Sequence, residues 1–210
     1  MSRHQIPQRH FSMIRDFHLA DFFTLGNAAC GTAAVLLAMR YVASGDLADF
    51  FWSVAMAPLA FVFDALDGRI ARWRQQHSAL GRELDSLADV ISFGVAPVAL
   101  AYAAGLRGGW DAVLLIYFVC CGVSRLARYN VTAESLAGEE GKVSYFEGTP
   151  IPTSVLLTAV FALIAWLGKL GAALPGGVRN LGPWELHTLA LLFALSGSLM
   201  ISKTVRIPKP

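Results

Sequence analysis

Four aspartates lie close together in the sequence, on either side of a basic segment, within residues 63–89, FDALDGRIARWRQQHSALGRELDSLAD. On an α-helix, residues three or four positions apart share a face. Asp64 and Asp67 therefore share one helical face, and Asp85 and Asp89 share another. If the chain reverses between the two pairs, the helices run antiparallel, and we expect all four carboxylates to face one cavity.

Such a cluster needs a counter-charge, because like charges at short range repel one another. Protons would make it a relay or an ion pathway, whereas one or two divalent cations would make it a metal centre. Oxygen ligands without His or Cys favour Mg²⁺, Mn²⁺ or Ca²⁺. The flanking residues favour metal, because Gly68, Ala71 and Gly81 keep the acidic faces free of bulk. Arg72 offers a fork for phosphate, so two cations with a phosphate between them would suit in-line phosphoryl displacement.

The aspartates belong to a longer pattern, D-x-x-D-G-x-x-A-R, eight residues, G-x-x-x-D-x-x-x-D, which runs from Asp64 to Asp89. The pattern matches the signature of the CDP-alcohol phosphotransferase family at every fixed position, and the chain resembles that family. The resemblance implies a six-helix membrane enzyme, commonly a homodimer, that transfers a substituted phosphate from a CDP-linked lipid to an alcohol and releases CMP. It also implies that Asp64, Asp67 and Asp85 hold the metals. By the same resemblance, Asp89 is a metal neighbour and the general base.

The resemblance extends to residues for both substrates. The residues that it places near the CDP-lipid are Thr24, Asn27, Gly68, Ala71, Arg72 and Gly81. The segments SRLARYNV and YFEGTPIPTS are most similar to the branch of the family that uses CDP-diacylglycerol as donor and L-serine as acceptor. Sibling enzymes that use inositol phosphate, glycerol phosphate or choline would share the donor site.

An amino-acid acceptor needs a cation for its carboxylate and a hydrogen-bond acceptor for its ammonium. Arg125 and Arg128 lie three residues apart at the inner end of a predicted helix, so they share a face and could bind the carboxylate. Either arginine could instead anchor the helix at the membrane surface. The other polar candidates, expected on the same side of the membrane as these arginines, are Asn130, Glu147, Thr149 and Thr153.

The composition places these residues in a membrane protein. Hydrophobic residues make up 55% and charged residues 15% of the 210 residues, and the mean hydropathy is +0.52. A soluble domain carries about 25% charged residues. An ionisable residue in a spanning helix costs about 2.5–3.5 kcal/mol, so a group of such residues indicates a function. The apolar runs predict six spanning helices at about 23–43, 50–71, 84–104, 109–127, 151–168 and 184–202.

The loops predict the orientation of the protein in its membrane. Most of the 17 Lys and Arg residues lie on the side of the aspartates, which predicts cytoplasmic termini and a cytoplasmic site at a bacterial inner membrane. Residues 1–21 are expected to be a juxtamembrane segment with a short amphipathic surface helix, and residues 22–203 a single all-α catalytic core. The basic residues are spread over several loops, which argues against a nucleic-acid site.

Two functions of other classes stay open at this point. A proton or ion carrier would use the aspartates as a relay, but it would leave the arrangement of Gly68, Ala71 and Arg72 unexplained. A catalytically silent membrane assembly protein would tolerate Asp85→Asn and Asp89→Asn, whereas a phosphotransferase would not.

Overall fold

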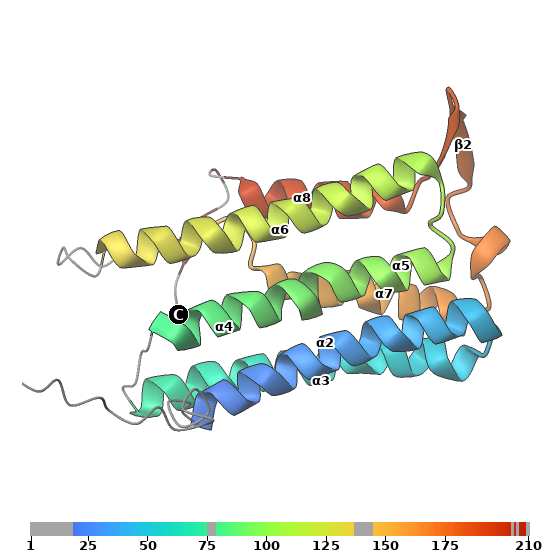
Figure 1. The fold of residues 1–210 in the computed structure, drawn as a ribbon. Coiled ribbons are helices and arrows are strands. Elements are labelled where there is room, and N and C mark those ends of the chain that lie inside the picture. The colour runs from blue at the N-terminus through green and yellow to red at the C-terminus, as the bar shows by residue number, and fades with distance from the viewer. Residues whose placement is uncertain (1–18, 75–78, 137–144, 203, 205, 209–210) are drawn as a thin grey trace, which may run out of the picture.

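The protein is a bundle of long helices, seen in a computed structural model (Figure 1). The structure describes residues 19–74, 79–136, 145–202, 204 and 206–208. The amphipathic surface helix expected in the first residues lies outside this part of the chain. The described helices form rods that run side by side along the length of the molecule.

The first three rods contain all four aspartates. α2 (Leu19–Ser44) and α3 (Leu47–Arg74) form an antiparallel pair. The third rod has three consecutive parts, namely α4 (Ala79–Asp89), the π-helix η1 (Val90–Val95) and α5 (Ala96–Ala104). Its parts contact α2, α6 and α7, so the third rod forms the centre of the bundle.

The remaining rods complete the bundle around the third one. α6 (Gly109–Leu136) follows a short turn and packs along α8 (Ala190–Ile201). Between them in the sequence, the 3₁₀ turn η2 (Ile151–Ser154) leads into α7 (Val155–Trp166), which packs against α3 and α5.

The turn between α2 and α3 shows why these two helices are antiparallel neighbours. Gly45 has φ of +71°, a left-handed conformation that glycine adopts without steric cost and that commonly ends a helix. Asp46 then accepts a hydrogen bond from the Ala48 N–H over 2.9 Å, which caps the start of α3. Two residues thus suffice to reverse the chain.

Four of the helical segments are long and apolar enough to cross a membrane, which needs about 20 residues. Two shorter apolar helices accompany them, at Ile151–Trp166 and Ala190–Ile201. The chain is therefore a mostly helical, multi-pass membrane protein. The long segments are Leu19–Ser44, Leu47–Ile70, Leu80–Ala104 and Gly109–Val131.

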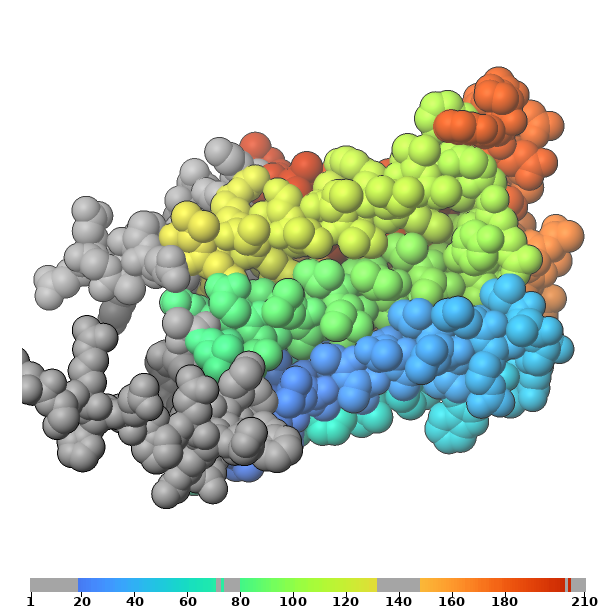
Figure 2. Space-filling view, viewed as in Figure 1, coloured from blue at the N-terminus to red at the C-terminus, as the bar shows by residue number. Residues whose placement is uncertain are grey.

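The prediction of a helix from residue 184 was wrong for residues 184–189. A β-hairpin precedes α8, with β2 (Val178–Leu181) antiparallel to β3 (Trp184–His187), and it projects from one end of the molecule (Figure 2, orange). Asp111, in the first turn of α6, holds β3 in place. Its carboxylate accepts the His187 N–H over 2.8 Å and contacts His187 Nδ1 over 2.6 Å. This anchor holds the segment extended as far as His187, where β3 ends.

A second short sheet joins distant parts of the sequence. β1 (Tyr145–Glu147), just before η2, pairs antiparallel with β4 (Arg206–Pro208), which follows α8. The bundle is all-α as expected, and the two small sheets are additions to it.

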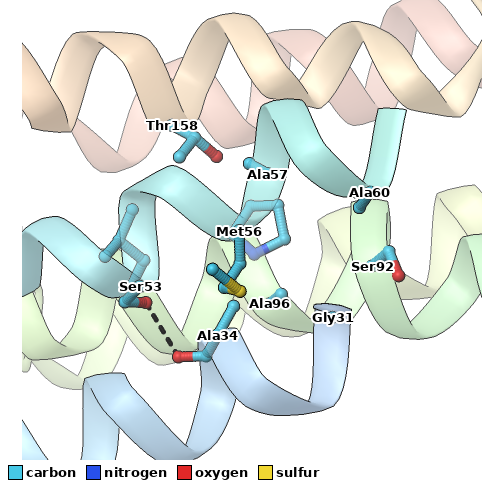
Figure 3. A pocket seen from close by; sticks show the side chains of 11 residues that line it. Gly31, Ala34, Ser53, Met56, Ala57, Ala60, Ser92, Ala96 and Thr158 are labelled. Carbon is cyan, nitrogen blue, oxygen red and sulfur yellow. Dashed lines mark hydrogen bonds between the residues drawn. The ribbon is translucent and has the colours of Figure 1, made fainter. Parts of the chain in front are cut away.

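A small cavity lies between α2, α3, the third rod and α7, lined mainly by small side chains (Figure 3). Ser53 Oγ donates to the Ala34 carbonyl over 2.8 Å, as Figure 3 shows. Ser92 Oγ donates to the Asn27 carbonyl over 2.8 Å. Thr158 Oγ1, from α7, is buried but has no hydrogen-bond partner among the described residues. The cavity therefore contains one hydroxyl whose burial is not compensated within the described bundle.

Thr158→Val should leave the free energy of unfolding unchanged or raise it. The substitution replaces a buried hydroxyl that lacks a partner by a methyl group of similar shape, which removes a desolvation cost of about 1–3 kcal/mol. Ser53→Ala should lower the free energy of unfolding by about 1 kcal/mol, because it removes a hydrogen bond that is made. Thermal unfolding of the purified variants in detergent compares the two. Equal losses would show that Thr158 has a partner, such as a buried water.

Candidate active site

Three carboxylates meet between α3 and α4. Asp64 and Asp67 come from α3 and Asp85 from α4, and one oxygen from each lies within 4.8 Å of the others. Asp67 is buried, while Asp64 and Asp85 are half-buried. The reversal of the chain between the two helices brings the acidic faces together, as the spacing of the aspartates predicts.

Asp89, the last residue of α4, lies beside the three-carboxylate cluster. Asp64 and Asp85 are within electrostatic range of its carboxylate. Asp89 is only 7% exposed, and Asn27 Nδ2 donates to its Oδ1 over 3.3 Å. Asp89 therefore differs from the three clustered carboxylates in having one oxygen held by an amide from α2.

α2 supplies hydrogen-bond donors to two of the four acids. Thr24 Oγ1 lies 2.8 Å from Asp67 Oδ2 and 3.3 Å from the carbonyl of Ala20, so the bond to the carboxylate is the shorter one. Asn27 lies one helical turn further along and holds Asp89. Sequence reasoning placed Thr24 and Asn27 near the nucleotide, and the structure shows both against carboxylates.

Close packing between α2 and η1 fixes the position of Asn27. Ser92 donates to the Asn27 carbonyl, and a Cβ added to Gly31 would lie 2.4 Å from Ser92 Oγ and 2.6 Å from Ser92 Cα. Only a residue without a side chain fits at Gly31. The contact lies three residues past Asp89, so it also fixes the start of the π-helix that follows the acid.

The remaining candidates for the CDP-lipid lie on α3 and α4. Gly68 is half-buried on α3, directly after Asp67. Gly81 is half-buried on α4. Ala71 and Arg72 belong to α3, but their side chains lie outside the part of the structure that is described.

Arg125 is a cation of α6 that interacts electrostatically with one of the four acids. It is half-buried and within electrostatic range of Asp89, and its Nε atom is buried without a hydrogen-bond partner in the described part of the chain. Arg128 is exposed, although it was expected to share this face. Asn130 donates to Ser86 Oγ over 3.0 Å and to Glu83 Oε1 over 3.3 Å, so it ties α6 to α4.

The segment that enters α7 brings two buried hydroxyls to the same end of the bundle. Thr149 Oγ1 and Ser154 Oγ are both buried, and neither has a hydrogen-bond partner within the described residues. Thr153 donates to the Pro150 carbonyl over 2.7 Å, so its hydroxyl is engaged locally. The side chain of Glu147 is not among those described. Ser154 was missed by sequence reasoning, which chose its neighbour Thr153.

The three-carboxylate cluster fits a divalent cation. Its donors are all oxygens, the ligands that Mg²⁺, Mn²⁺ and Ca²⁺ prefer. Asp85 Oδ1 is buried and has no hydrogen-bond partner in the part of the chain that the structure describes. A buried carboxylate oxygen of this kind calls for a proton, a water or a metal ion. The neutral character of Thr24 and Asn27 leaves the negative charge of the acids in place.

Residues 17–197 match the sequence profile of the family described as CDP-alcohol phosphatidyltransferase. The chain belongs to this family. The match contains all four aspartates and the α2 residues that hold two of them.

Several relatives share most of this CDP-alcohol phosphatidyltransferase chain. The CDP-diacylglycerol–serine O-phosphatidyltransferase of Saccharomyces cerevisiae is 41% identical over 211 residues, covering 97% of this chain and 75% of the relative. The enzyme of that name from Mycobacterium leprae is 36% identical, with 68% and 47% covered. The archaetidylserine synthase of Methanothermobacter thermautotrophicus is 35% identical, with 74% and 62% covered. The chain thus spans between about half and three quarters of the length of these relatives.

Thr24→Val should weaken the binding of Mn²⁺ by about 10- to 100-fold, because it removes the hydrogen bond that orients Asp67 and keeps the side-chain shape. Thr32→Val is the matched control, since Thr32 is exposed on the same helix and its hydroxyl bonds to the Ala28 carbonyl. Electron paramagnetic resonance of free Mn²⁺ measures both affinities. The same affinity in the two variants would contradict the assignment of Asp67 as a ligand.

Gly31→Ala should lower the free energy of unfolding by about 1–3 kcal/mol, because the new methyl group would press on the backbone of Ser92. Gly26→Ala on the same helix should cost less. Its Cβ would lie 3.2 Å from the edge of the Phe63 ring, which can rotate away. Thermal unfolding in detergent compares the two alanines, and an equal effect would show that α2 and η1 are not in close contact.

Proposed function

We propose that the protein transfers the phosphatidyl group of CDP-diacylglycerol to the hydroxyl of L-serine, forming phosphatidylserine and CMP. The observation that carries the proposal is the cluster of Asp64, Asp67 and Asp85 within the segment that matches the family. The relatives support the acceptor, because the yeast and M. leprae proteins are both named for serine and CDP-diacylglycerol.

The three-carboxylate cluster would hold Mg²⁺ or Mn²⁺, and a pair of ions if phosphate oxygens of the donor complete the coordination. Divalent cations bound there would neutralise the charge of the transferred phosphate and of the departing CMP. Thr24 orients one ligand through its bond to Asp67, so α2 contributes to the geometry of the site without supplying charge.

Asp89 would act as the general base. The proton of the serine hydroxyl moves to Asp89 while the hydroxyl oxygen forms a bond to the phosphatidyl phosphorus. The bond from phosphorus to the CMP oxygen breaks, and its electron pair leaves with CMP. A carboxylate suffices for this role, because proton removal accompanies formation of the new bond. Asn27 Nδ2 donates a hydrogen bond to Asp89 Oδ1, which fixes the orientation of the base.

Arg125, Thr149 and Ser154 would bind the acceptor. All three have a buried polar atom without a partner among the residues described, which is what a site awaiting a polar ligand presents. The guanidinium of Arg125 suits the serine carboxylate, and its electrostatic interaction with Asp89 supports an acceptor site beside the proposed base. The hydroxyls of Thr149 and Ser154 suit the ammonium group, since each can accept a hydrogen bond.

The membrane topology, oligomeric state and orientation of the protein are also proposals. We propose six membrane-crossing segments, with α7 and α8 as the two short ones, and a homodimer of this chain. The basic loops favour cytoplasmic termini and an active site that takes CDP-diacylglycerol from the cytoplasmic leaflet. A bacterial inner membrane is the setting that we favour.

The acceptor is tested by CMP release from the protein purified in detergent, with CDP-diacylglycerol and Mg²⁺ or Mn²⁺ present. L-serine should support release, whereas inositol phosphate, glycerol phosphate and choline should not. The product formed with serine should be phosphatidylserine by mass. Release that depends on one of the other alcohols would overturn the choice of acceptor and retain the reaction type.

Asp89→Asn should lower the turnover number by about 10²- to 10⁴-fold, the usual contribution of a general base, while CDP-diacylglycerol still binds. Asp46→Asn is the matched control, because Asn caps a helix as well as Asp does and residue 46 lies in the α2–α3 turn. Serine-dependent CMP release measures both variants. Normal turnover in Asp89→Asn would remove Asp89 as the base.

A further inference from the structure

The segment that contains Thr149 and Ser154 follows β1, which pairs with β4, the strand that comes after α8. β1, which ends at Glu147, pairs with β4 in an antiparallel register that sets Phe146 opposite Ile207. Gly148 and Thr149 come directly after β1 in the sequence. The position of the proposed acceptor hydroxyls thus depends on β4, which lies more than 50 residues later in the sequence.

Two further contacts fasten this segment to the end of α8. The Thr149 N–H donates to the Leu199 carbonyl over 3.2 Å. Gly148 has φ of +73°, and a Cβ added there would lie 2.3 Å from the Met200 carbonyl oxygen. Glycine is required at this position both by its conformation and by the lack of space. The backbone before η2 is therefore placed by β4 and α8 together.

The other side of the same segment packs against η1 and α6. Ile151, in η2, is 1% exposed, and its Cδ1 lies 2.7 Å from the position of a Cβ on Gly122 and 3.9 Å from that on Gly94. Gly122 lies one turn before Arg125 on α6, and Gly94 belongs to η1, which starts after Asp89. Residues 148–154 therefore form a strap between α8 on one side and η1 and α6, the elements that follow Asp89 and carry Arg125, on the other.

We propose that β4 is a positioning element for the acceptor alcohol. This inference rests on the proposed function, and it adds that acceptor affinity depends on a segment that touches neither substrate. A two-stranded sheet of this size contributes little stability of its own. α8 is anchored independently, since Phe193 packs edge-to-face on Phe118 of α6 at 5.2 Å. Loss of β4 should therefore loosen the strap, which α8 alone would then hold, and spare the bundle.

The test compares the full chain with a variant that ends at Ser202 and with Gly148→Ala in the full chain. Both changes should raise the KM for L-serine by about tenfold or more, because the acceptor hydroxyls must then be ordered on binding. The KM for CDP-diacylglycerol and the affinity for Mn²⁺ should stay the same. Gly45→Ala is the matched control, because Gly45 has nearly the same φ, +71°, with open space around it in the α2–α3 turn.

An unchanged KM for serine in both variants would overturn the proposal. So would an equal loss of donor and acceptor binding together with a lower melting temperature, since that result would make β4 a general support of the fold. The proposed function fails separately, if the full chain releases no CMP with serine. The comparison is then made with the alcohol that does support release, so the role of β4 is still decided.

Discussion

The mutual repulsion of closely spaced carboxylates is the constraint around which this bundle is organised. Asp64, Asp67 and Asp85 bring oxygens within 4.8 Å of one another in a protein built mostly of apolar helices. The donors that hold the acidic groups from α2, Thr24 and Asn27, are neutral, so they orient the carboxylates without cancelling their charge. An arrangement of this kind is suited to capturing a cation, because neither of these two donors supplies positive charge to the carboxylates.

The two halves of the third rod, α4 and α5, pack against different neighbours. α4 must present its acids to α3 and α2, whereas α5 must pack against α7, and the π-helix η1 separates the two parts directly after Asp89. π-helical turns recur at functional sites, since they alter the side-chain register without breaking the helix. Gly31 and Ser92 lock η1 against α2 at this point. Asp89 and Asn27, which donates a hydrogen bond to it, are thereby positioned by one helix contact.

The sequence allowed the acidic cluster to be predicted, because helical periodicity alone puts each pair of aspartates on one face. It could not reveal that Thr24 holds Asp67, since that bond depends on how α2 and α3 pack. The sequence also did not indicate that the Ser154 hydroxyl, and not that of Thr153, lacks a partner. That difference depends on a 3₁₀ turn in which Thr153 bonds to the Pro150 carbonyl. The helix expected from residue 184 failed for a related reason, as a distant aspartate holds that segment extended.

We propose that these carboxylates bind a divalent cation that the transfer reaction requires. The most direct measurement is a titration of chelator-treated protein with Mn²⁺, in which serine-dependent CMP release and bound Mn²⁺ are followed together. Release should be absent from the metal-free protein and should rise in proportion to the bound metal. Full CMP release from protein that holds no divalent metal would contradict the account.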